Sequence, residues 1–68
     1  MYSELINYFT DENFDVVVHT DDGKSHKMLL FLGEDEYFLK ISTLSGVMHI
    51  KKEKIVSMEY QDPDKRNF

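Results

Sequence analysis

The sequence predicts a mainly β domain: a short N-terminal α-helix followed by a five-stranded, strongly bent antiparallel sheet closed as a small barrel. Two observations favour this fold class. From residue 14 to residue 60, stretches rich in β-branched and aromatic residues alternate with short turn signals, as in strands joined by hairpins. The chain has 68 residues, which is enough for one domain, and a single small sheet buries an apolar face by bending round on itself.

The helix is expected at about residues 3–9. Ser3 suits the N-cap position, and Glu4 suits the positive end of the helix dipole. Leu5, Ile6 and the aromatic residues that follow supply an apolar side, and a polar break begins at Thr10. So short a helix is marginal unless it docks onto the rest of the domain.

The strands follow between residues 14 and 60, separated by turn signals such as Asp22-Gly23, where glycine supplies the positive φ of a tight hairpin. Gly33-Glu34-Asp35 is the next expected turn. We expect a single domain over residues 1–61 and a polar C-terminal tail over 62–68. The five expected strands are 14–19, 24–32, 36–42, 47–51 and 55–60.

The second expected strand is apolar on both faces, whereas a sheet in a small monomer has one core face and one wet face. One core cannot bury all of these apolar side chains, which leaves Leu29, Phe31 and Phe38 to be covered in another way. They are expected to meet the helix, a partner subunit or both. Self-association is favoured, because an open five-stranded sheet also leaves edges that need pairing.

Composition restricts the classes of function. The chain has no cysteine, which removes disulfides and thiolate zinc sites. The longest apolar run, 28–32, is too short to span a bilayer, and the N-terminus lacks a signal-peptide pattern, so a cytoplasmic protein is expected. The formal net charge is −5, and all of this excess lies in residues 1–34. A nucleic-acid site would therefore have to be local, since phosphate contacts normally dominate affinity.

The order of motifs resembles the Sm-like (Hfq-type) family over about residues 4–60. Val16-Val17-Val18, Asp22-Gly23, the long strand 24–32 and Asp35 before an aromatic strand are similar to the first motif of that family. Residues 48–52 and 55–58 are similar to its second motif, and Ile50-Lys51-Lys52 is similar to the basic corner that lines the pore in Hfq.

The resemblance implies a cyclic homo-oligomer of about five to seven subunits, in which the last strand of one subunit pairs with the fourth strand of the next. Such a ring also adds stability to a domain that is marginally stable alone because it is so small. The candidate subunit-interface residues are Leu29, Phe31, Met48, Ile50, Met58 and Tyr60.

Single-stranded RNA is the partner that the resemblance implies, with Lys51 and Lys52 as candidate phosphate contacts. Tyr37 and Phe38 are candidate stacking surfaces for bases. The alternative is an oligomeric protein-interaction module without a nucleic-acid role, which the acidic N-terminal half favours.

No pattern indicates an enzyme, a cofactor or a metal site. The chain has no nucleophile motif and no phosphate-cradling glycine loop, and the acids at 34–36 are expected to be solvated turn residues. His19, His26 and His49 are the only possible nitrogen ligands. His19 and His26 lie on opposite arms of a hairpin, so a shared site is conceivable, but neither has an acid at helical ligand spacing.

Overall fold

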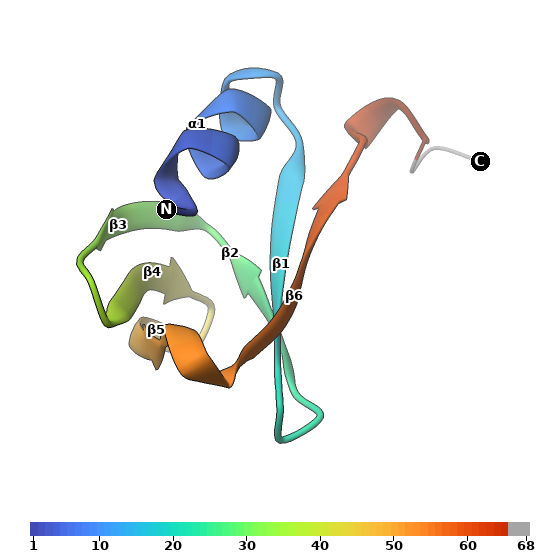
Figure 1. Ribbon diagram of the computed structural model, residues 1–68. Coiled ribbons are helices and arrows are strands. Elements are labelled where there is room, and N and C mark those ends of the chain that lie inside the picture. Colours follow the sequence, from blue (N-terminus) through green and yellow to red (C-terminus); the bar gives the residue numbers. More distant parts are fainter. Residues whose placement is uncertain (66–68) are drawn as a thin grey trace.

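The computed structural model describes residues 1–65 of the chain, the side chain of Lys65 excepted. A helix and six strands follow one another with short connections, as the sequence colouring in Figure 1 shows. The elements are α1 (Ser3–Asp11), β1 (Asp15–Thr20), β2 (Ser25–Met28), β3 (Leu30–Glu34), β4 (Phe38–Thr43), β5 (Gly46–Lys51), the 3₁₀ turn η1 (Lys52–Lys54), β6 (Ile55–Gln61) and a second 3₁₀ turn, η2 (Pro63–Lys65).

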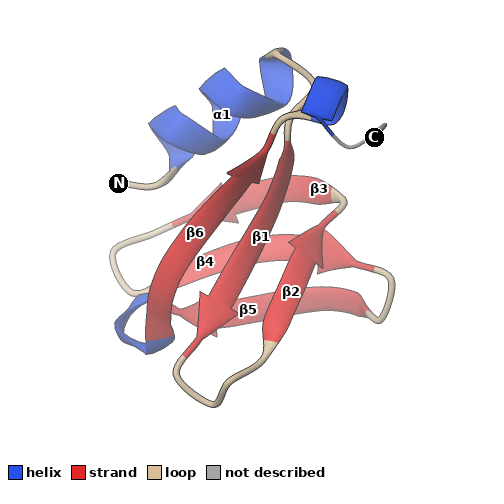
Figure 2. Ribbon diagram, turned by 90° about the vertical axis from the view of Figure 1, so that its right-hand side faces the viewer, coloured by secondary structure: helices blue, strands red, loops and turns tan. Residues whose placement is uncertain are grey.

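The strands form two antiparallel three-stranded sheets with the orders β2-β1-β6 and β3-β4-β5. Figure 2 shows the two sheets as layers whose strands run across one another. In the first sheet Val18 pairs with both His26 and Met58. In the second, Leu39 pairs with both Glu34 and Ile50. Side chains from the facing sides of both sheets meet in the middle, as in other two-layer β folds.

The expectation of five strands is wrong, because the expected second strand divides at Leu29 into β2 and β3. Met28 pairs with Val16 in the first sheet, whereas Leu30 pairs with Ser42 in the second. The backbone N–H of Leu29 already donates to the carbonyl of Ser42, at 2.8 Å. The chain therefore changes hydrogen-bonding partners at this residue, which explains why apolar side chains occupy both faces of the run.

The expected closed barrel is also wrong. Closure requires a continuous ladder around the sheet, whereas here the ladders stop at the two three-stranded sheets. The apolar faces of the two sheets are buried against each other and against the helix. The core consists of Ile6, Val16, Val18, Met28, Leu39, Ile41 and Ile50.

The helix α1 is held by one buried residue and by aromatic contacts. Ile6 is fully buried, and Phe9 stacks on Tyr60 of β6 with ring centroids 4.3 Å apart. Phe9 also contacts Phe14 at 5.0 Å. Tyr2, not Ser3, occupies the N-cap position, and the backbone N–H of Ser3 donates to a side chain of the second sheet instead. Docking thus supplies the stability that a helix of nine residues lacks alone.

The first part of the expected tail carries a short element. Pro63–Lys65 form η2, and residues 66–68 of the expected tail lie outside the described part of the chain. Among residues 1–65, no helix is long and apolar enough to cross a membrane.

Candidate nucleic-acid interface

The four residues that the sequence nominates for RNA line one cleft of about 480 Å³. Tyr37 and Phe38 come from the β3–β4 turn and the start of β4, and Lys51 and Lys52 from the end of β5 and the start of η1. Two carboxylates, Glu36 and Glu53, complete the lining. We call this site the aromatic cleft. Its walls come from the β3–β4 turn and from η1, two segments that lie far apart in the sequence.

The β3–β4 turn is shaped by Asp35. One oxygen of its carboxylate, Oδ1, accepts hydrogen bonds from the backbone N–H groups of Tyr37 and Phe38, both at 2.8 Å. The backbone N–H of Asp35 in turn donates to the carbonyl of Phe38 at 3.0 Å. The bonds from Phe38 and Tyr37 hold the pKa of Asp35 below its ordinary value. This turn presents the Tyr37 ring outward, where 67% of the residue is exposed.

Backbone pairing holds the two walls together. The N–H of Lys52 donates to the carbonyl of Tyr37 at 2.8 Å, immediately beyond the β4–β5 ladder in which Phe38 pairs with Lys51. The wall carrying the lysines is therefore continuous with the sheet that carries the aromatic residues. The relative position of ring and ammonium groups does not depend on a long loop.

Lys52 is engaged by Glu34, which the sequence analysis placed in a solvated turn. That expectation is wrong: Glu34 is the last residue of β3, and its side chain is only 2% exposed. The ammonium of Lys52 lies 2.5 Å from Oε2 of Glu34, and the backbone N–H of Ser3 donates to Oε1, also at 2.5 Å. Burial raises the pKa of Glu34, but the bonds from Lys52 and Ser3 outweigh burial and lower it to about 2.

Because of this ion pair, the charges of the two lysines differ in their availability to a ligand. Lys52 is largely buried with its charge balanced by Glu34, whereas Lys51 is exposed at the end of β5. The aromatic cleft therefore has one lysine available for an incoming phosphate, not two. The sequence contains no local signal for this, because Glu34 and Lys52 are brought together only by the fold.

The six candidate interface residues do not share one surface. Ile50 is a core residue, and Phe31, Met48, Met58 and Tyr60 pack against the core while remaining partly exposed. Leu29 is 51% exposed at the point where β2 becomes β3. Among the edge strands, β3 carries Leu30 (63% exposed), β5 carries Val47 (60% exposed) and β6 carries Val56 (68% exposed).

A second cleft of about 500 Å³ lies between the β1–β2 turn and β5. Its lining includes Lys24, Lys51 and Lys54, together with the β5 residues Met48 to Ile50. The N–H of Asp21 donates to the carbonyl of Lys54 at 2.9 Å, which ties this turn to η1. We call it the edge cleft, because one of its walls is the edge strand β5.

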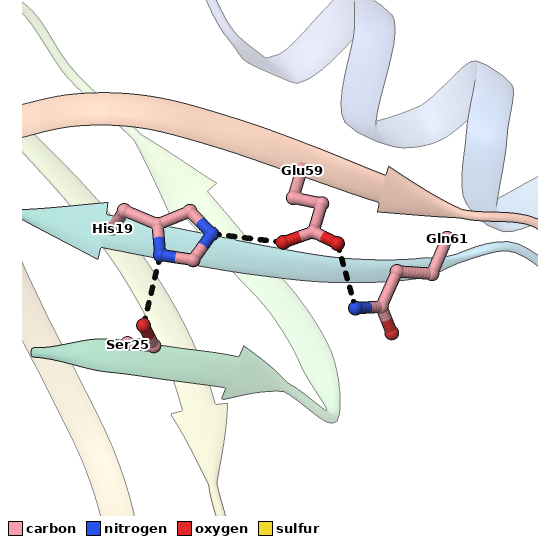
Figure 3. A network of polar contacts seen from close by, with 4 residues as sticks. All are labelled: His19, Ser25, Glu59 and Gln61. Atoms are coloured by element: carbon pink, nitrogen blue, oxygen red, sulfur yellow. Dashed lines mark hydrogen bonds and ion pairs between the residues drawn. The ribbon is translucent and has the colours of Figure 1, made fainter.

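The outer face of the first sheet carries a polar network that the sequence analysis did not foresee (Figure 3). The His19 ring bridges two strands, with Nδ1 2.8 Å from Oγ of Ser25 and Nε2 3.0 Å from Oε1 of Glu59. Gln61 donates from Nε2 to the other oxygen of Glu59 at 2.8 Å. The bonds from Gln61 and His19 lower the pKa of Glu59. Cross-strand pairing at His19↔Ser25 produces this network.

The histidines do not converge on a metal site. His26 of β2 pairs with the core residue Val18 of β1, and its Nε2 lies 3.3 Å from the hydroxyl of Thr20. His19 follows Val18 along β1 and therefore faces the opposite side of the sheet. Within residues 1–65, no group of three or more His, Cys, Asp or Glu side chains is placed to hold a metal ion.

Comparison with known proteins adds no relative. No protein-family model, no curated protein and no solved structure matches the chain. What the structure defines is a small β-rich domain of two crossed three-stranded sheets with a docked N-terminal helix and an aromatic cleft at one edge.

Proposed function

We propose that this protein binds single-stranded RNA in the aromatic cleft and assembles into a homo-oligomer that repeats this cleft. One observation carries the proposal. Tyr37, Phe38, Lys51 and Lys52, nominated from separate parts of the sequence, line the same cleft. Aromatic rings beside a cation are the combination that proteins use to hold single strands, with bases stacked on rings and phosphates near positive charge.

The exposed ring of Tyr37 is the stacking surface in this proposal. Two thirds of the residue is accessible, and the Asp35 turn fixes the backbone on which the ring sits. Stacking one base on an aromatic side chain contributes about 1–3 kcal/mol, whatever the base. Lys51 supplies the phosphate contact, since Lys52 is balanced by Glu34.

Assembly compensates for the weakness of a single cleft. One base and one phosphate contact hold a strand poorly, especially on a chain of net charge −5. Several clefts on one oligomer engage the same strand together, which raises the overall affinity without any new contact. The edge strands β5 and β6, with exposed Val47 and Val56, are the surfaces through which copies pair in this proposal.

RNA binding is tested by fluorescence anisotropy with a labelled single strand of about twelve nucleotides. Tyr37→Ala is expected to weaken binding about tenfold, whereas Tyr8→Ala, at an exposed tyrosine of α1, leaves it unchanged. Lys51→Gln is expected to lower the salt slope by about 0.7, and the matched Lys27→Gln on the first sheet is not. Equal effects of each variant and its control would contradict the proposal.

Assembly is tested by light scattering on the full chain at several concentrations. The expected result is one discrete mass that persists on dilution. Val56→Lys, which places a charge on the β6 edge, should shift the mass toward the 8.1 kDa monomer. Leu44→Lys adds the same charge on a turn where the leucine is 92% exposed, and it should leave the mass unchanged. A wild-type monomer throughout would contradict assembly.

The second candidate is an oligomeric protein-interaction module without a nucleic-acid role. It is favoured by the carboxylates Glu36 and Glu53, which offset the lysines within the aromatic cleft. The edge cleft lies beside the edge strand β5, which suits pairing with a strand from another protein chain. Its lining is mixed in charge, with Lys24, Lys51 and Lys54 beside Asp21 and Asp22. Wild-type protein that forms oligomers but binds no RNA would favour this function.

A further inference from the structure

We infer that the aromatic cleft selects guanine among the bases of a single strand, through the carboxylates of Glu36 and Glu53. The inference rests on the proposed RNA binding and specifies which base that site takes. It starts from the composition of the cleft lining, in which two aromatic residues, two lysines and two glutamates border the same space of about 480 Å³.

The four acids in or next to this cleft differ in whether their carboxylates are already hydrogen-bonded. Glu34 is bound by Lys52 and Ser3, and Asp35 is bound by the backbone N–H groups of Tyr37 and Phe38. Glu36 and Glu53 are exposed, and within residues 1–65 neither carboxylate has a hydrogen bond or ion pair. Their accepting oxygens are therefore available to a ligand in the cleft.

An ionised carboxylate accepts hydrogen bonds and donates none. Guanine is the base whose Watson–Crick edge offers two adjacent donors, N1–H and the 2-amino group, and this spacing matches the two oxygens of one carboxylate. Adenine and cytosine offer one amino group beside an accepting ring nitrogen. Uracil offers one N–H between two carbonyl oxygens. A carboxylate therefore pairs bidentately with guanine and meets at least one repelling lone pair on each of the other bases.

The remaining groups of the cleft are compatible with that pairing. Tyr37 accepts a purine ring by stacking, which does not distinguish guanine from adenine. The ammonium of Lys51 is a donor suited to O6 of guanine or to its phosphate. The carboxylates also repel phosphate, so they lower the affinity for every strand and repay this loss only when guanine is present.

The experiment measures, by fluorescence anisotropy, how tightly labelled strands of about twelve nucleotides bind to the 68-residue chain. The strands alternate uridine with guanosine, inosine, adenosine or uridine, which avoids the self-association of guanine runs. The guanosine strand is expected to bind about tenfold more tightly than the adenosine and uridine strands. Inosine lacks the 2-amino donor, so most of this preference should be lost with the inosine strand.

Variants of the carboxylates locate the effect. Glu36→Gln and Glu53→Gln are expected to reduce the guanosine-to-adenosine affinity ratio toward one, in at least one of the two variants, while binding to the uridine strand becomes tighter. Glu12→Gln removes the same charge at the exposed end of α1 and should leave the ratio unchanged. The ratio is the readout, because a variant that merely loosens the turn weakens all strands alike.

The possible outcomes test different parts of the proposal. Measurable binding with equal affinity for all strands would overturn guanine selection and leave the proposed RNA binding standing. A preference for guanosine that persists in both glutamine variants would overturn the role of the carboxylates. Displacement of the strand by an equal concentration of GMP would reassign the cleft to a free nucleotide. Absence of binding to every strand would overturn the proposed function itself.

Discussion

The side chains of Glu34 and Lys52 meet at 2.5 Å across the boundary between the end of β3 and the start of η1, and Ser3 of α1 joins the same carboxylate. Three segments that are separate in the sequence thus converge on one buried anion. The bond from Ser3 holds the helix start against the second sheet, and the ion pair with Lys52 balances one positive charge of the aromatic cleft. Stability and ligand binding are therefore coupled through Glu34.

Glu34→Gln should reduce the dependence of stability on pH in acid. The pKa of Glu34 is lowered from 4.5 to about 2, so its carboxylate contributes stability above pH 4.5 that is lost as the pH falls toward 2. The contribution is on the order of 2 kcal/mol. Urea unfolding of both proteins between pH 7 and pH 2 measures it. Parallel stability curves for wild type and variant would contradict this role.

Ile6→Ala should destabilise the domain by about 2–4 kcal/mol, because the side chain is fully buried beneath α1 and its loss leaves a cavity. Leu5→Ala is the matched control, since Leu5 is the preceding residue and is 52% exposed. It should cost well under about 1 kcal/mol. Chemical denaturation gives both values, and similar losses for the two variants would indicate that α1 is not docked through Ile6.

Asp35→Ala should weaken RNA binding without direct contact with the ligand. The substitution removes the acceptor for the N–H groups of Tyr37 and Phe38, so the ring of Tyr37 is no longer held in place. A small loss of stability should accompany it, since the two backbone N–H groups lose their acceptor. Asp35→Asn keeps an accepting oxygen and should restore most of the binding. Failure of asparagine to do better than alanine would point to the charge of Asp35 instead of its hydrogen bonds.

His19 should carry its proton on Nε2 when neutral. Glu59 accepts hydrogen bonds only, so Nε2–H donates to it, and Nδ1 then accepts from the hydroxyl of Ser25. Nitrogen-15 chemical shifts of the imidazole ring distinguish the two tautomers. Ser25→Ala and Glu59→Gln should each shift the balance, and a dominant Nδ1–H form in the wild type would contradict the network. Because these groups are partly exposed, His19→Ala should cost no more than about 1 kcal/mol.

The sequence by itself determined the local character of most segments. The signal Asp22-Gly23 correctly marked a turn. Such signals depend on neighbouring residues, so they can be read from the sequence alone. The grouping of Tyr37, Phe38, Lys51 and Lys52 came from the resemblance; the four residues line one cleft, and their role in RNA binding stays a prediction.

Only the tertiary structure decided how the strands are connected. A two-residue period reports which face a side chain occupies but not which strand the backbone pairs with, so the change of partner at Leu29 was invisible in an unbroken apolar run. For the same reason the sequence predicted that Glu34 is a solvated turn residue, although the fold buries its side chain against Lys52 and Ser3. Pairing between distant segments is set by the packing of whole sheets, and this decided both the two-layer architecture and the charge of the cleft.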